Sequence, residues 1–381
     1  CFFHINASGQ LDLCENGVVE KNRHRWLLSL DGGAIRCTMY LRTLVALEEA
    51  TNQPIVNLFD GIAGTSMGGI IACMLTMPHP DNSSRPKYFA KDILDVILAN
   101  RTQIFDPNRC SLKGILTPRY KYKSVRKILS NEFGKNNYKN RLLPTVIVAN
   151  DLTTHSGVCF ATTDDLDFYT EDLAMATGAA LTCYNPQTIT SLCASRTYTL
   201  SDGGTAMNNP TFAGIKLLQE YYKIPIEKIN VFSMGAGILS LNNDSRFTDG
   251  LLSWGPQIGE IFMKGQLSTI DYMASIFLKD RYHRFNPYLE KENIVWMDDI
   301  SDSGMKKLKK ISADMLRSKK EELDDIIRLL NLVVEAKNQE PAIVRTVYEP
   351  PQHEHLRKEN PSYFVSRLQR LIVWVFGWFS K

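Results

Sequence analysis

Several hallmarks of other protein classes are missing from this 381-residue sequence. No apolar run reaches the ~20 residues that a membrane-spanning helix requires. The formal net charge of +3 is too small to indicate nucleic acid as a partner. There is no internal repeat, no H-E-x-x-H motif and no EF-hand-like loop, so we expect neither a bound metal ion nor another cofactor.

The cysteines lack the spacing of a disulfide or metal framework. None of the eight belongs to a C-x-x-C pair, and a chain of this length needs no disulfides to support its core. Reduced thiols in a reducing compartment are therefore expected. No signal peptide is visible. Because the chain begins at Cys1 rather than Met, we expect a trimmed terminus, with a processed lipoprotein cysteine as the alternative.

Short apolar segments typical of strands alternate with helical stretches, which predicts an α/β fold with helices on the faces of a sheet. Residues 1–24 are expected to be irregular, and 78–86, with three prolines, to form a polar loop. The predicted strands cover 26–30, 58–63, 144–150 and 229–234, with an edge strand at 282–285.

The C-terminal part differs in character. Residues 301–381 carry 15 Lys/Arg against 11 Asp/Glu, and an apolar stripe predicts one helix over about 305–338. Residues 363–379 combine an apolar helical face with Trp374 and Trp378, whose rings suit a lipid head-group region. We interpret this segment as a membrane-interface helix, with a helix docked on the protein's own core or a dimer contact as the alternatives.

A serine lies between glycines in Gly64-Thr65-Ser66-Met67-Gly68. The G-x-S-x-G pattern places a serine on a sharp turn between a strand and a helix, where its hydroxyl protrudes. Glycines on either side remove side chains that would clash in that turn. Taken alone, the pattern also fits a plain glycine-rich turn with a capping serine.

A second glycine turn, Asp31-Gly32-Gly33-Ala34, follows the first predicted strand. Its backbone N–H groups at Gly32, Gly33 and Ala34 are suited to stabilise the oxyanion of an acyl-transfer intermediate. Arg36 would brace this loop or attract an anionic head group. A plain strand–helix connection is the alternative interpretation.

A third turn, Asp202-Gly203-Gly204, supplies a candidate base for the serine. An aspartate has a pKa near ~3.9 in water, so burial would have to raise the pKa of Asp202. The alternative is an aspartate that bonds its own turn. Only His283, His353 and His355 follow Asp202, and none has a glycine-flanked setting, so a Ser–Asp dyad fits better than a Ser-His-Asp triad.

In their order DGGAIR, GTSMGG and DGG, these motifs make the chain resemble the patatin-like phospholipases over about residues 24–300. The resemblance implies a three-layer α/β/α fold with a mainly parallel sheet. It divides the chain into an N-terminal segment (1–24), a catalytic domain (25–300) and a helical C-terminal extension (301–381).

The resemblance also implies a lipid acyl hydrolase of the phospholipase A or lysophospholipase type. Ser66 would attack the acyl ester of a glycerophospholipid and Asp202 would take its proton. Gly32, Gly33 and Ala34 would hold the oxyanion. The supporting residues would be Arg36, Gly64, Gly68 and Gly203.

Two positions depart from the family pattern, because Ala34 and Cys37 stand where glycines are usual. Alanine keeps its N–H donor but restricts φ. A silenced lipid-binding protein and a Ser-His-Asp lipase or thioesterase therefore stay open as alternatives. The expected partner is a phospholipid membrane surface, with a homodimer also considered. The expected location is the cytoplasm or the membrane periphery, or secretion into a host if the source is an intracellular bacterium.

Overall fold

The computed structural model describes residues 2–5, 11–14, 23–107, 117–239, 251–289 and 294–339. The chain separates into two units, 1–343 and 344–381, and the second lies outside the described residues. The predicted interface helix at 363–379, with His353 and His355, therefore also lies outside them. No helix in the described part of the chain is both long and apolar enough to cross a membrane.

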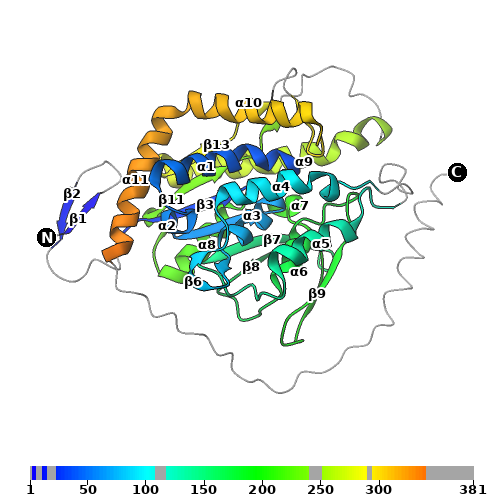
Figure 1. Cartoon of the computed structure of the whole chain (residues 1–381), viewed down its shortest axis with the longest axis horizontal. Coiled ribbons are helices and arrows are strands. Elements are labelled where there is room, and N and C mark those ends of the chain that lie inside the picture. The colour runs from blue at the N-terminus through cyan, green and yellow to red at the C-terminus, as the bar shows by residue number, and fades with distance from the viewer. Residues whose placement is uncertain are drawn as a thin grey trace, which may run out of the picture. The chain divides into compact units, whose positions relative to one another are not determined.

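A sheet of eight strands forms the centre of the first unit (Figure 1). The strands are β3 (Arg25–Leu30), β4 (Gly61–Thr65), β7 (Thr145–Asp151), β8 (Ser156–Ala161), β9 (Gln187–Thr190), β10 (Thr197–Asp202), β11 (Ile229–Met234) and β13 (Tyr282–Phe285). Their order is β13-β11-β3-β4-β7-β10-β9, with β8 also paired to β7. Neighbours from β13 to β7 are parallel, whereas β8, β9 and β10 pair in antiparallel fashion. The predicted mainly parallel sheet is confirmed, and so is the edge strand at 282–285.

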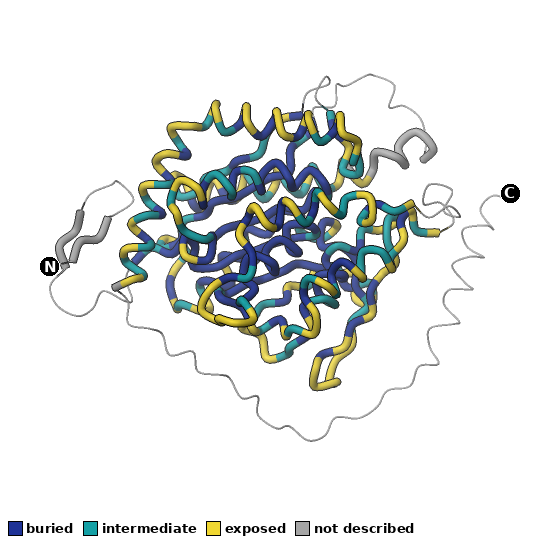
Figure 2. Tube along the Cα trace, viewed as in Figure 1, coloured by how far each residue is buried: buried dark blue, intermediate teal, exposed yellow. Residues whose placement is uncertain are grey.

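Helices cover both faces of this sheet. One apolar core joins it to α1 (Thr38–Thr51), α3 (Met67–Leu75), α4 (Ala90–Ile104), α5 (Tyr122–Phe133) and α6 (Thr170–Thr177), and the other to α8 (Thr211–Tyr222) and α9 (Leu251–Leu278). Strand β3 shows why both faces must be apolar: Leu27 belongs to the second core, and its neighbours Trp26 and Leu28 belong to the first. Figure 2 shows the buried residues gathered along the strands and inner helices. The three-layer α/β/α arrangement is confirmed.

Strand β7 presents one edge to two strands that run in opposite directions. Parallel β4 pairs with its first half and ends where Thr65 faces Val148. Antiparallel β10 pairs with its second half and ends where Asp202 faces Ala149. Because Val148 and Ala149 are consecutive, the two strands end head to head, and the turns that follow them are brought together.

Three local expectations were wrong. The run 58–63 is not one strand, because α2 (Ile55–Leu58) precedes β4. Residues 78–86 form a hairpin of β5 (Pro78–His79) and β6 (Asn82–Pro86); the prolines face each other in register at its open end, where missing N–H donors do little harm. In the N-terminal segment, β1 (Phe2–Ile5) pairs with β2 (Leu11–Cys14).

The segment after residue 300 forms two helices instead of the single predicted one. They are α10 (Asp302–Ser318) and α11 (Lys320–Gln339), and they meet at Lys319, which has left the helical conformation. Leu308, Ile326 and Leu330 are buried in the same core as α1. The Ser312 hydroxyl donates to the carbonyl of Met39 at 2.9 Å. These helices therefore pack as part of the first unit.

We expect Leu330→Ala to lower the free energy of unfolding by about 2–5 kcal/mol, because it leaves a cavity under α11. Urea denaturation followed by tryptophan fluorescence measures this loss. Leu332→Ala is the matched control, since Leu332 is 40% exposed and its truncation should change stability by no more than about 0.5 kcal/mol. Equal shifts in the two variants would mean that α11 does not share the core.

Candidate active site

Ser66 lies on a strained turn between β4 and α3. Its backbone has φ 54° and ψ −128°, a combination that non-glycine residues rarely adopt and that costs of order 1–3 kcal/mol. Thr177 supports the turn: its Oγ1 accepts the N–H of Ser66 at 2.9 Å and donates to the carbonyl of Val148 on β7 at 2.6 Å. The serine is thus held half-buried at the N-terminus of a buried helix.

The glycines around Ser66 are explained by close backbone approaches. A side chain at Gly64 would run into the backbone of Gly68, and one at Gly68 would lie 2.6 Å from the carbonyl oxygen of Asp31. A side chain at Gly203 would strike the carbonyl of Val148. The three supporting glycines predicted from the sequence therefore let α3, β3 and the Asp202 turn converge on one point.

Asp202 lies within hydrogen-bonding reach of the serine. The Ser66 hydroxyl donates to Asp202 Oδ2 at 2.6 Å across 136 positions of sequence, and the Gly204 N–H donates to Oδ1 at 2.6 Å. Burial raises the pKa of Asp202 to about 6, while these two hydrogen bonds oppose the rise. The carboxylate is thus ionised at neutral pH, yet it is a stronger base than an exposed aspartate.

The loop after β3 lies directly against the serine. A side chain built on Gly32 would come within 2.9 Å of Ser66 Cβ. Asn208 holds this glycine from both sides: its carbonyl accepts the Gly32 N–H at 3.2 Å, and its side-chain amide donates to the Gly32 carbonyl at 3.2 Å. The expectation that Gly32 donates to an oxyanion needs correction, because its N–H is already bonded.

Other donors stay available beside the serine. Within the described residues, no acceptor is bonded to the N–H groups of Gly33, Ala34 or Met67. Ala34 adopts φ 49°, the left-handed conformation that glycine would take, so the substitution keeps the backbone of the loop. Met67 was missed from the sequence, although the residue after such a serine commonly supplies an oxyanion donor.

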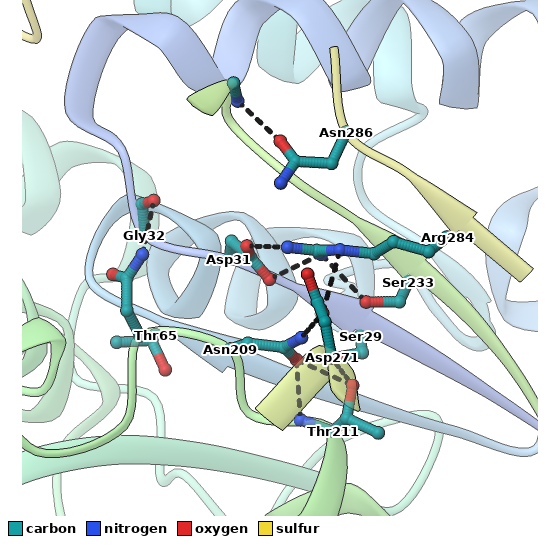
Figure 3. A network of polar contacts seen from close by, with 12 residues as sticks. Ser29, Asp31, Gly32, Thr65, Asn209, Thr211, Ser233, Asp271, Arg284 and Asn286 are labelled. Carbon is teal, nitrogen blue, oxygen red and sulfur yellow. Dashed lines mark hydrogen bonds and ion pairs between the residues drawn. The ribbon is translucent and has the colours of Figure 1, made fainter. Parts of the chain in front are cut away.

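A buried ion pair anchors Asp31, the first residue of the loop after β3 (Figure 3). Arg284 on β13 binds Asp31 through two contacts, Nη1 to Oδ1 at 2.9 Å and Nη2 to Oδ2 at 2.6 Å. Arg284 also contacts Asp271 of α9 at 3.2 Å, and Asp271 accepts hydrogen bonds from Tyr282 at 2.7 Å and Asn209 at 2.9 Å. The network links α9, the sheet edge and the turn beyond Asp202, and the sequence did not indicate it.

Neither of the remaining candidates in the described part of the chain, Arg36 and His283, is hydrogen-bonded to Ser66. Arg36 is only 2% exposed, which fits a brace for the loop and not a contact with a head group in solvent. His283 on β13 stacks on Trp26 and lies 3.6 Å from Glu322. No histidine in the described part of the chain is bonded to Ser66, and no group of three metal-ligating side chains gathers there.

Comparison with known proteins agrees with these motifs. Residues 28–215, which contain the Asp31 loop, Ser66 and Asp202, match the family model of the patatin-like phospholipases. The chain carries a patatin-like domain. It is similar to Patatin-like protein 1 of Arabidopsis thaliana, with 26% identity over 77% of this chain and 81% of that protein. It is similar to Patatin-15 of Solanum tuberosum, with 27% identity over 76% of this chain and 83% of that one.

Among solved structures, VipD from Legionella pneumophila aligns with 83% of this chain and 70% of its own, at 12% identity and a TM-score of 0.33. That likeness is too weak to support an argument. The domain is similar to the patatin-like phospholipases. The family match ends before β11, α9 and β13, so Arg284 lies outside it.

Replacing Arg284 should destabilise the patatin-like domain strongly. Arg284→Gln leaves the buried carboxylate of Asp31 without its ion-pair partner, and we expect a loss of about 3–5 kcal/mol in the free energy of unfolding. Chemical denaturation measures it. Arg317→Gln breaks an exposed pair with Asp314 and should cost less than about 1 kcal/mol. A similar small loss in both variants would contradict an anchoring role for the Asp31 pair.

Proposed function

We propose that this protein is a lipid acyl hydrolase of the phospholipase A or lysophospholipase type that works through a dyad of Ser66 and Asp202. The observation that carries the proposal is the 2.6 Å hydrogen bond from the serine hydroxyl to a buried carboxylate. Further support comes from the strained turn and from the unbonded N–H groups beside it.

In the acylation step, Asp202 accepts the proton of Ser66 as Oγ attacks the carbonyl carbon of a fatty-acyl ester. The carbonyl oxygen becomes an oxyanion, which the N–H groups of Gly33, Ala34 and Met67 stabilise together with the positive end of α3. Asp202 then returns the proton to the departing lysolipid or glycerol oxygen. The fatty acyl group stays on Ser66 as an ester.

In the deacylation step, Asp202 takes a proton from water, and the resulting hydroxide attacks the acyl ester. The same donors stabilise the second oxyanion. The bond to Ser66 breaks, the serine regains a proton from Asp202 and the fatty acid leaves. A base with a pKa near 6 suits both directions of proton transfer. At neutral pH it is ionised and can accept a proton, and it is basic enough to take that proton from a hydroxyl group.

Two alternatives find less support. A histidine base would need to reach Ser66, whereas His283 is packed against Trp26 at the sheet edge. A silenced site would be expected to show a distorted loop. Ala34 nevertheless holds the left-handed conformation, and Cys37 packs behind the loop with its thiol 3.7 Å from the Asp31 carbonyl. We propose a phospholipid membrane surface as the partner, since the substrate resides there.

A fluorophosphonate probe tests the nucleophile. The probe should label the wild-type chain by forming a bond to Ser66 Oγ, and Ser66→Ala should abolish the labelling. Asp202→Asn should slow labelling and soluble-ester hydrolysis by about 10²- to 10⁴-fold, since the base is lost. Ser84→Ala, at an exposed serine of β6, is the matched control and should label normally. Undiminished labelling of Ser66→Ala would refute the proposal.

The dependence of kcat/KM on pH tests the base. Asp202 is active when ionised, so activity on a soluble ester should rise with pH through a midpoint near 6 and level off above 7. Joint substitution of His283, His353 and His355 should leave this midpoint in place. A profile that loses its ionisation in the histidine variant would assign the base to a histidine. Circular dichroism at pH 5 tests whether the protein is still folded where its activity has fallen.

A further inference from the structure

Helix α9 exposes several large apolar side chains on one side. Between Ile261 and Leu278 the sequence holds two charged residues, Lys264 and Asp271. Ile261, Tyr272 and Ile276 lie along one side of the helix at helical spacing, and Phe262 and Met273 lie on the adjoining row. All five side chains are exposed, Phe262 by 65% and Tyr272 by 69%. None of these five exposed side chains carries a charge.

Lys264, Gln266 and Asp271 of α9 point the other way, whereas the exposed hydroxyls of Ser268, Thr269 and Ser275 donate to carbonyls of the helix itself. Lys264 donates to the carbonyl of Leu239 at 2.9 Å, and Gln266 donates to the carbonyl of Thr205 at 2.7 Å. Asp271 lies in the network around Arg284, and Ala274 and Leu278 are fully buried. These contacts fix the orientation of α9 against the rest of the protein. The exposed apolar side chains therefore face away from the core.

A second surface helix shows what a water-facing side looks like in this protein. On α10 the buried positions are apolar apart from Ser312, whereas Lys306, Lys307, Lys309 and Lys310 are exposed. The outward side of α9 carries the opposite chemistry. Its combination of aromatic and aliphatic side chains with one phenol hydroxyl suits the boundary between head groups and acyl chains.

The position of α9 relates this face to the candidate active site. Met263, Lys264 and Leu267 line a small pocket together with Asp31, Gly32 and Asn208. Gln266 is bonded to Thr205, three residues beyond Asp202. Figure 1 shows α9, in yellow-green, at the periphery of the molecule. A surface that rests on the outward side of α9 would therefore be separated from this pocket by the helix itself, which is about 10 Å thick.

We propose that the outward face of α9 is the surface with which the protein sits on a phospholipid bilayer. The apolar side chains enter the head-group boundary, and the uncharged face lets them do so without desolvating an ion. This inference rests on the proposed function, because the bilayer that α9 binds is the one that holds the acyl substrate. The proposed membrane-binding surface on α9 is thus distinct in sequence from the predicted interface helix at 363–379.

Sedimentation with sucrose-loaded vesicles of phosphatidylcholine and phosphatidylglycerol tests the proposal. The full chain carries Ser66→Ala, so that binding is measured without hydrolysis. Adding Phe262→Ser and Ile276→Ser should lower the vesicle partition coefficient by about tenfold or more. Tyr221→Ser with Leu332→Ser is the matched control at exposed apolar residues of α8 and α11, and its partitioning should equal that of the parent.

The outcomes separate this proposal from its rivals and from the proposed function. Unchanged partitioning of the α9 variant, or a parent that does not bind vesicles, overturns it. So does a loss confined to a Trp374→Ser, Trp378→Ser variant, which would assign binding to the tail. If light scattering shows that the α9 variant loses only dimer formation, the face binds a second copy instead. With Ser66 intact, the α9 variant should keep its rate on a soluble ester, and fluorophosphonate labelling tests the dyad separately.

Discussion

The meeting of Ser66 and Asp202 depends on how strand β7 shares one of its edges. A parallel and an antiparallel strand approach along this edge from opposite ends and stop at consecutive residues, Val148 and Ala149. The turn after each strand must then occupy the same small volume. Bulky residues are excluded there, which explains Gly64, Gly68 and Gly203 together. Desolvation of Asp202, and with it the raised pKa, follows from the same crowding.

The loop beside the serine depends on supports from distant parts of the chain. Asn208 holds Gly32 through two hydrogen bonds, and Arg284 holds Asp31 across 253 positions of sequence. Rigid supports of this kind matter because backbone donors stabilise an oxyanion only when they are already oriented. Asp271 adds α9 to the arrangement, so the helix that we propose to meet the lipid and the loop that we propose to hold the oxyanion share one polar network.

Much of this could be predicted from local sequence, since strand-length apolar runs and glycine turns are local signals. They located the strands around residues 26–30, 144–150 and 229–234, together with Ser66 and Asp202. What was missed depends on partners far away in the chain. The hydrogen bond from the Gly32 N–H is made to Asn208, which is 176 positions away in the sequence. The ion pair of Arg284 with Asp31 could be predicted only by knowing that β13 lies two strands from β3. The break between α10 and α11 at Lys319 has no proline or glycine from which it could be predicted.

The placement of β11 has a consequence for fragments of this protein. A piece limited to residues 28–215 would contain Ser66 and Asp202 but would end before β11, which covers the free edge of β3. Such a piece would also begin inside β3 and keep only Leu28, Ser29 and Leu30, whose backbone groups pair with β11 in the whole chain and would lie at an exposed edge. Such a fragment should self-associate instead of folding. The span matched by the family model is therefore shorter than the sheet, which continues through β11 to β13.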